Sequence, residues 1–317
     1  DDYGYIKVDK ALSHPEKCKN RFSKQRWEEF KKDLLFFQNH EKGRWVKKIQ
    51  DKGYNATPIW NMAASIISNA TPIDEDNIKI LASIDILLIL IAFIFVVYAF
   101  GIETALLAAV IFFASYPLQP THIRGGFMRY DWIATLLVSI SLLKMKKYAL
   151  SGTALAFSTA SRVFPLLFAA GLGVRLIVSF VRKKEDLRRY MAFFTAFAVT
   201  LTALTMASVA YYGDTEYWQE FVSKIDLHND DISTTRIGLK YFFLNRGETS
   251  NLDFEKKYGG NYSWTAVTQF KQLLWTRAKP FCMGVAFLLC FAWLFLQRKL
   301  KDHEALALGF PLLFLLT

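Results

Sequence analysis

The chain has 317 residues, of which 53% are hydrophobic and 16% aromatic, and it carries a formal net charge of +11. Its apolar residues gather in long blocks, which excludes an ordinary soluble core. The lysines and arginines lie mainly in short clusters between these blocks and near the start of the chain, so the excess charge indicates membrane topology and not nucleic-acid binding.

The first part of the chain, residues 1–77, is polar and charged. Within it Trp27, Phe30, Leu34 and Phe37 are spaced three or four residues apart among lysines and glutamates. That spacing places the four side chains on one face of a helix, which suits a helix lying on a membrane surface. An ordinary soluble helix packed on its neighbours fits the same pattern.

Long apolar blocks follow, and several reach the roughly 20 residues that a helix needs to cross a bilayer with its backbone groups bonded internally. The blocks are residues 78–100, 102–116, 132–143, 148–164, 166–180, 190–211, 280–296 and 305 onward. We therefore predict an all-α polytopic membrane protein. Because the chain starts without Met and its last block looks like part of a span, we expect it to be truncated at both ends.

The predicted organisation has four parts. They are an external loop with amphipathic interfacial helices at 1–77, a transmembrane bundle at 78–212, a second external loop at 213–278, and C-terminal transmembrane helices at 279–317.

The basic clusters fix the predicted topology. Short cytoplasmic loops carry the excess of Lys and Arg, so the clusters at 144–147, 182–189 and 298–301 are expected on one side of the membrane. Counting the apolar blocks between them is consistent with this assignment. The polar segments at 1–77, 117–131, 162–165 and 213–278 then lie on the opposite face, which makes the expected active face of this multi-pass protein periplasmic, extracellular or lumenal.

Cofactor motifs are missing from the sequence. It contains no glycine-rich phosphate loop and no His or Cys spacing typical of a metal site. The sequence therefore indicates no required cofactor, assigns no metal ligand and leaves a divalent metal open. Membrane lipids are expected around the chain, and no nucleic acid is expected as a partner.

Two acidic residues open the chain. Asp1 and Asp2 directly precede Tyr3 and Tyr5 on the predicted external face. Moving a sugar from a lipid phosphate onto a hydroxyl needs a base for the hydroxyl proton and cations for the departing phosphate. Either aspartate has the chemistry of that base, and a solvated start of the chain is the alternative.

A second candidate segment joins two apolar blocks. It contains His122, Arg124, Arg129 and Asp131 beside a Gly pair. Asp131 adjoins Trp132 at the mouth of a span, where an unpaired carboxylate is costly, so a partner such as Arg129 or Arg162 is expected. Structural pairing and phosphate binding both explain these charges.

Arg162 lies between two apolar blocks on the face that otherwise avoids positive charge. A guanidinium can hold a phosphate with two parallel hydrogen bonds, which suits a polyprenyl-phosphate head group at that depth. An arginine that only extends its charge to the membrane surface is the alternative, and we favour phosphate binding.

The last predicted loop adds mixed charges, among them His228, Arg236 and Lys240. Such a mixture is usually a solvated surface. Its place on the same predicted face as the first segment makes contact with the acceptor or the phosphate the other interpretation.

Four stretches of the chain, taken in order, are similar to a known family. They are Asp1-Asp2-Tyr3 with Tyr5 and residues 10–12, the Pro58-containing stretch 54–60, the Gly-polar segment 125–132 before a span, and the small-residue block 152–165 that ends in a basic residue near a proline. Together with the topology, they resemble the GT-C class of membrane glycosyltransferases. The closest resemblance is to the bacterial branch that depends on polyprenol-phosphate-mannose, glycosyltransferase family 87.

The resemblance implies a GT-C-like bundle with a helical first external loop and a second large external loop. It implies inverting transfer of a mannose-like sugar from a polyprenyl-phosphate donor to a glycan, lipid or protein acceptor. Asp1 or Asp2 would be the catalytic base and Arg162 a ligand of the donor phosphate. We expect further phosphate contacts from Arg129, Arg236 or Lys240, and supporting polar contacts from His122, Arg124, Asp131 and His228.

Two rival functions fit the same composition. A transporter or flippase of a lipid-linked or anionic solute also needs intramembrane Arg and Asp, but the internal pseudo-symmetry common in transporters is not visible in the sequence. A non-catalytic membrane subunit that binds a partner protein through its external loops is the second rival.

Overall fold

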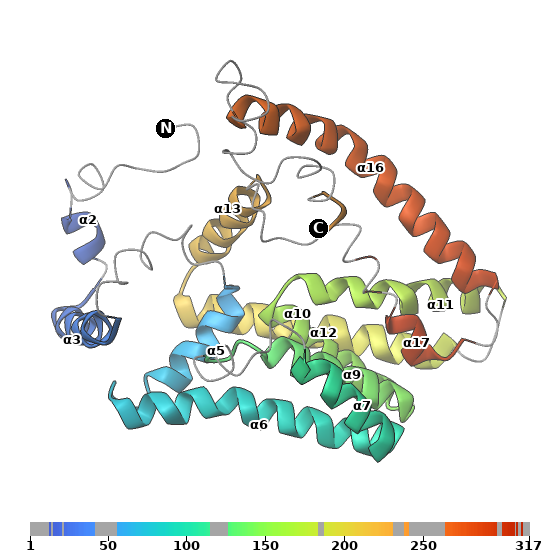
Figure 1. The fold of residues 1–317 in the computed structure, drawn as a ribbon, viewed down its shortest axis with the longest axis horizontal. Helices are drawn as coiled ribbons and strands as arrows, with labels where there is room; N and C mark the ends of the chain where they lie inside the picture. Colours follow the sequence, from blue (N-terminus) through green and yellow to red (C-terminus); the bar gives the residue numbers. More distant parts are fainter. Residues whose placement is uncertain are drawn as a thin grey trace. The chain divides into compact units, whose positions relative to one another are not determined.

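The computed structural model describes residues 13, 15–20, 22–41, 56–114, 126–182, 187–230, 238–240, 264–296, 300–307, 309 and 312. All regular secondary structure in these residues is helical (Figure 1). The prediction of an all-α chain is confirmed for this part of the sequence.

Within the described residues, four helical segments are long and apolar enough to cross a membrane. They are α6 (Glu75–Phe100), the run Phe164–Val181 formed by η2 (Phe164–Phe168) and α11 (Ala169–Val181), α12 (Leu187–Tyr212), and Lys271–Trp293 within α16 (Trp264–Leu296). Each contains one of the predicted apolar blocks or most of one. These helices support a membrane protein, as the sequence predicts.

Other predicted blocks form shorter helices. α9 (Asp131–Lys144) and α10 (Tyr148–Ser161) have 14 residues each. Such a helix is about 21 Å long, which is less than the roughly 30 Å of a hydrocarbon core. α7 (Ile102–Ala114) is shorter still, with 13 residues. The second predicted loop is partly helical, because it contains α13 (Glu216–Asp230) and the start of α16.

The first of two compact units comprises residues 1–54 and 71–79. Its described helices are α2 (Glu16–Lys19) and α3 (Lys24–Glu41), and α3 confirms the helix expected from the apolar stripe. Trp27 and Phe30 contact each other and Phe22, with ring centroids 5.2 to 5.7 Å apart. Phe37 on the same stripe is 43% exposed, and its ring contacts Phe36 at 5.7 Å between centroids.

The second unit comprises residues 55–70 and 80–317, and its core lies where α10 packs against α9 and α12 (Figure 1). Small residues let these helices approach closely. Ser139 on α9 and Ser151 on α10 each donate a hydroxyl hydrogen bond to the other's carbonyl oxygen, both 2.8 Å long. On the other side of α10, a Cβ atom added to Gly152 would lie 2.2 Å from the carbonyl oxygen of Phe193 in α12.

α17 (Asp302–Ala307) packs against α11, and here too a glycine allows close approach of a neighbouring backbone. A Cβ atom added to Gly171 would lie 1.8 Å from the carbonyl oxygen of Ala305. Ala305 and Leu306 are fully buried, so this short helix is held in the second unit despite its six residues.

The close approach of α10 to α12 generates the first prediction. Gly152→Ala places a methyl group against the Phe193 carbonyl, and we expect it to lower the free energy of unfolding by about 1–3 kcal/mol, as overpacking does. Gly173→Ala is the matched control, because its methyl would meet only the Phe194 ring at 3.8 Å. Thermal unfolding of the purified chain in detergent measures both variants. Equal midpoints for the two variants would contradict the close approach.

Candidate functional site

The predicted site residues divide into described and undescribed ones. Asp1, Asp2, His122, Arg124 and Arg236 lie outside the described residues. His228 lies on α13, and Lys240 is buried with 7% exposure. The remaining three, Arg129, Asp131 and Arg162, lie near one another at one end of α9 and α10, together with Asp85 of α6. We call these four residues the Asp131 cluster.

Asp85 organises the chain that leads into α9. It is fully buried, and its carboxylate accepts hydrogen bonds from the backbone N–H groups of Arg129 at 3.0 Å and Tyr130 at 3.1 Å. Trp60 of α5 (Pro58–Ser68) holds the same turn by donating its indole N–H to the carbonyl oxygen of Met128 at 2.8 Å. Met128 has a φ of +48°, a backbone conformation that needs such support.

Asp131 and Arg162 are brought together because α9 and α10 run antiparallel. Asp131 begins α9, and Arg162 follows the last residue of α10. Burial raises the pKa of the Asp131 carboxyl above its ordinary value, while the Ser161 hydroxyl and the Arg162 guanidinium oppose the rise. Of the two partners expected for Asp131, Arg162 is the one that acts on its carboxyl group.

The guanidinium of Arg162 is half-buried, and it makes no hydrogen bond or ion pair with the residues that the structure describes. One carboxylate oxygen of Asp131, Oδ1, is buried and likewise has no hydrogen-bond partner among them. Thr57, at the start of α5, donates its hydroxyl to the carbonyl oxygen of Ala160 and so ties α5 to this end of α10. The cluster therefore offers a positioned cation with unused donors beside a partly desolvated carboxyl.

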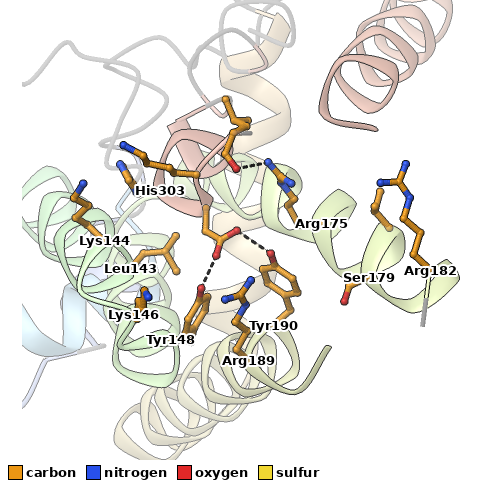
Figure 2. Close-up of a pocket in the computed structure, with 14 residues that line it drawn as sticks. Leu143, Lys144, Lys146, Tyr148, Arg175, Ser179, Arg182, Arg189, Tyr190 and His303 are labelled. Atoms are coloured by element: carbon orange, nitrogen blue, oxygen red, sulfur yellow. Dashed lines mark hydrogen bonds between the residues drawn. The ribbon is translucent and has the colours of Figure 1, made fainter. Parts of the chain in front are cut away.

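A cavity of about 460 Å³ lies at the opposite end of α9 and α10 (Figure 2). Its charged lining comes from α9, α11, α12 and the residues around α17, and we call it the basic cavity. The described lining contains six Lys and Arg side chains and one carboxylate, namely Lys144, Lys146, Arg175, Arg182, Arg189, Lys301 and Asp302.

The basic cavity brings together the three basic clusters that the topology argument used. Lys144 and Lys146 come from the first cluster, Arg182 and Arg189 from the second, and Lys301 from the third. The three clusters therefore meet at one end of the bundle, as the sequence predicts. Which side of a membrane this end faces remains a prediction.

Asp302 lines the basic cavity beside Tyr148 and Tyr190. Its carboxylate accepts hydrogen bonds from the hydroxyl groups of Tyr148 and Tyr190, the latter 2.8 Å long. Burial and the neighbouring Asp302 carboxylate raise the pKa of Tyr148, so its hydroxyl stays protonated and donates. Arg189 lies over both tyrosine rings, 5.4 and 5.3 Å from their centroids.

Arg175 and His303 form a further part of the cavity wall. Arg175 donates from Nη2 to the carbonyl oxygen of Leu300 at 2.5 Å, which fixes the approach to α17. Burial, and next Lys144, lower the pKa of His303, so its ring is neutral at neutral pH and adds no charge to the cavity. The sequence patterns do not single out Asp302, Tyr148, Tyr190 and Arg175 as a set, although they identify the lysines and arginines around them.

The described residues contain no group of three or more His, Cys, Asp or Glu side chains placed to hold a metal ion. Comparisons of the chain with protein-family models, curated proteins and solved structures found no match. The class of protein therefore comes from its own features. Among the described helices, four have the length and composition of membrane spans and support a helical membrane protein, and polar clusters lie at both ends of the packed pair α9 and α10.

The buried carboxylate of Asp85 generates the second prediction. Asp85→Ala leaves the N–H groups of Arg129 and Tyr130 without their acceptor, and each loss costs about 1–3 kcal/mol of unfolding free energy. Asp76→Ala on the same helix is the control, because the Asp76 side chain is 88% exposed and its removal should change stability by less than about 0.5 kcal/mol. Unfolding in detergent compares the two, and an Asp85→Ala variant as stable as the control would refute the role of Asp85.

Proposed function

We propose that the chain is a membrane glycosyltransferase of the GT-C class. It moves a mannose-like sugar from a polyprenyl-phosphate donor to a hydroxyl of a glycan, lipid or protein acceptor on the non-cytoplasmic face, with inversion at the anomeric carbon. The proposal combines the order of the sequence features with the chemistry of the Asp131 cluster.

The proposal rests on the burial and hydrogen bonding of the Arg162 side chain. Its guanidinium is half-buried and makes no hydrogen bond or ion pair with described residues, yet it lies beside the buried carboxyl of Asp131. A structural arginine at such a depth usually has its donors engaged. Donors held near a membrane boundary and left unused suit two parallel hydrogen bonds to a phosphate.

The proposed reaction balances without a further reactant. Asp1 or Asp2 takes the proton of the acceptor hydroxyl, and the oxygen then attacks the anomeric carbon from the side opposite the phosphate. A new C–O bond forms while the bond from the anomeric carbon to the phosphate oxygen breaks, and its electron pair leaves with the phosphate. Arg162 stabilises that developing charge, with help from Arg129, Arg236 or Lys240.

The other polar residues support these steps. Asp131 positions Arg162 through their electrostatic attraction, and Asp85 holds Arg129 through its backbone. His122, Arg124 and His228 are proposed to contribute further polar contacts from the adjoining loops.

The Asp131 cluster and the basic cavity lie at opposite ends of α9 and α10, and this determines on which side of the membrane we propose that sugar transfer takes place. Lys144 and Tyr148 lie at the far ends of α9 and α10 from Asp131 and Ser161. The positive-inside rule favours a cytoplasmic place for the basic cavity, where three clusters of Lys and Arg meet. The Asp131 cluster is then directed to the other face, where a lipid-linked donor replaces cytosolic nucleotide sugars.

The third prediction concerns Arg162. Arg162→Ala should reduce sugar transfer from a polyprenyl-phosphate donor by about 100-fold or more, the usual cost of removing one donor to a developing oxyanion. Arg162→Lys keeps the charge but not the paired donors, so we expect intermediate activity. Arg188→Ala removes an exposed guanidinium elsewhere and serves as the control. If activity falls only in proportion to the amount of folded Arg162→Ala protein, Arg162 has a structural role.

The fourth prediction concerns the base. Asp1→Asn or Asp2→Asn should lower transfer by about 10²–10⁴-fold, the usual contribution of a general base, and the more severe variant identifies it. The amount of bound donor should stay close to that of the unchanged chain. Full turnover in both single variants and in the double variant would refute the assignment.

A further inference from the structure

The basic cavity has a charge imbalance that the proposed sugar transfer does not use. In the part of the chain that the structure describes, six Lys and Arg side chains and one carboxylate line about 460 Å³ at the end of the bundle away from the Asp131 cluster. Like charges this close repel one another where neighbouring protein limits screening by water. Such an arrangement is stabilised by a bound anion.

The carboxylate in the described wall belongs to Asp302 and is engaged by hydroxyl groups. Both oxygens of Asp302 accept hydrogen bonds from tyrosine hydroxyls, those of Tyr148 and Tyr190. Asp302 thereby joins α17 to α10 and α12. His303 stays neutral at neutral pH because burial, and then Lys144, lower its pKa. Among the lining residues that the structure describes, positive charges therefore outnumber negative ones.

Several lining groups are held in place by contacts on the protein side. Arg189 stacks over the rings of Tyr148 and Tyr190, and Arg175 donates to the Leu300 carbonyl. The Nζ atom of Lys144 lies 5.5 Å from the centroid of the Phe100 ring. Ser179 also lines the cavity; it is 4% exposed, and its hydroxyl has no hydrogen-bond partner among the described residues.

We propose that the basic cavity binds a phosphate group, as carried by the head group of an anionic phospholipid or by a small soluble phosphate ester. Planar guanidinium groups match phosphate oxygens with paired hydrogen bonds, lysines add point charges, and the Ser179 hydroxyl can donate one more bond. The volume falls in the roughly 300–1,000 Å³ range of small-molecule sites. Basic pockets between membrane helices near the cytoplasmic surface are typical sites for anionic head groups.

This inference stands apart from the proposed transferase. It uses none of the residues assigned to sugar transfer, and it requires neither Asp1, Asp2 nor Arg162. A chain with no transferase activity can still carry this site.

The test measures binding to the full chain purified in detergent. One arm titrates inorganic phosphate by calorimetry, and the other follows dioctanoyl-phosphatidylglycerol by native mass spectrometry, with dioctanoyl-phosphatidylcholine as the zwitterionic comparison. Saturable binding of phosphatidylglycerol alone identifies a lipid head group as the source of the phosphate. Binding of inorganic phosphate identifies a soluble ligand. Saturable binding of neither probe overturns the proposal.

Two pairs of substitutions separate a built site from general attraction. Arg182→Gln with Lys301→Gln removes two cavity cations, and we expect at least about tenfold weaker binding, because each charge-assisted hydrogen bond is worth about that factor. Lys147→Gln with Arg188→Gln removes the same charge from exposed residues that do not line the cavity, so binding should change by less than about twofold.

The conservative pair Arg182→Lys with Lys301→Arg keeps the charge and guards against loss of folding in the first pair. It should retain saturable binding, and size-exclusion profiles confirm that each variant is folded. Equal weakening by the cavity pair and the exposed pair overturns the proposal, since it would mean that only net charge matters.

Discussion

The structure depends on how closely α10 approaches its two neighbours. Reciprocal hydrogen bonds between Ser139 and Ser151 join it to α9, and Gly152 lets the Phe193 carbonyl of α12 lie where a side chain would otherwise be. Small residues at these contacts let the backbones approach closely. Because α9 and α10 run antiparallel, this contact fixes which charges meet at each end. Both candidate sites are consequences of it.

The acids of the second unit show how it accommodates charge beside apolar packing. Isolated carboxylates are costly away from water, and each of these is given donors. The Asp85 carboxylate accepts hydrogen bonds from two backbone N–H groups, and the Asp302 carboxylate accepts hydrogen bonds from two tyrosine hydroxyls. Both carboxylates therefore hold chain segments together. Asp131 differs, since its Oδ1 atom is buried and has no hydrogen-bond partner among the described residues.

Sequence patterns predicted the coarse fold well because apolar blocks and basic clusters are local signals. The apolar blocks predicted α6, α11 and α12. The basic clusters predicted that their lysines and arginines lie at one end of the bundle. Asp85 and Asp302 were missed, since one acid in a sequence says nothing about donors 45 or 154 residues away. The sequence predicts that either Arg129 or Arg162 is the ionic partner of Asp131. The antiparallel packing of α9 and α10 is what favours Arg162. The role of Asp1 and Asp2 stays a prediction outside the described residues.

The two ends differ in how they would recognise phosphate. Two carboxylates, of Asp85 and Asp131, accompany Arg129 and Arg162 in the Asp131 cluster, so its charge is close to balanced and an anion gains little from the general field. Selection there must come from the paired donors of one guanidinium and from the shape around it. The basic cavity instead attracts anions by its excess charge, so its selectivity is lower and more sensitive to salt. A site that must select one lipid-linked sugar among many anions is therefore better served by the Asp131 cluster, where acidic and basic charges are nearly equal in number.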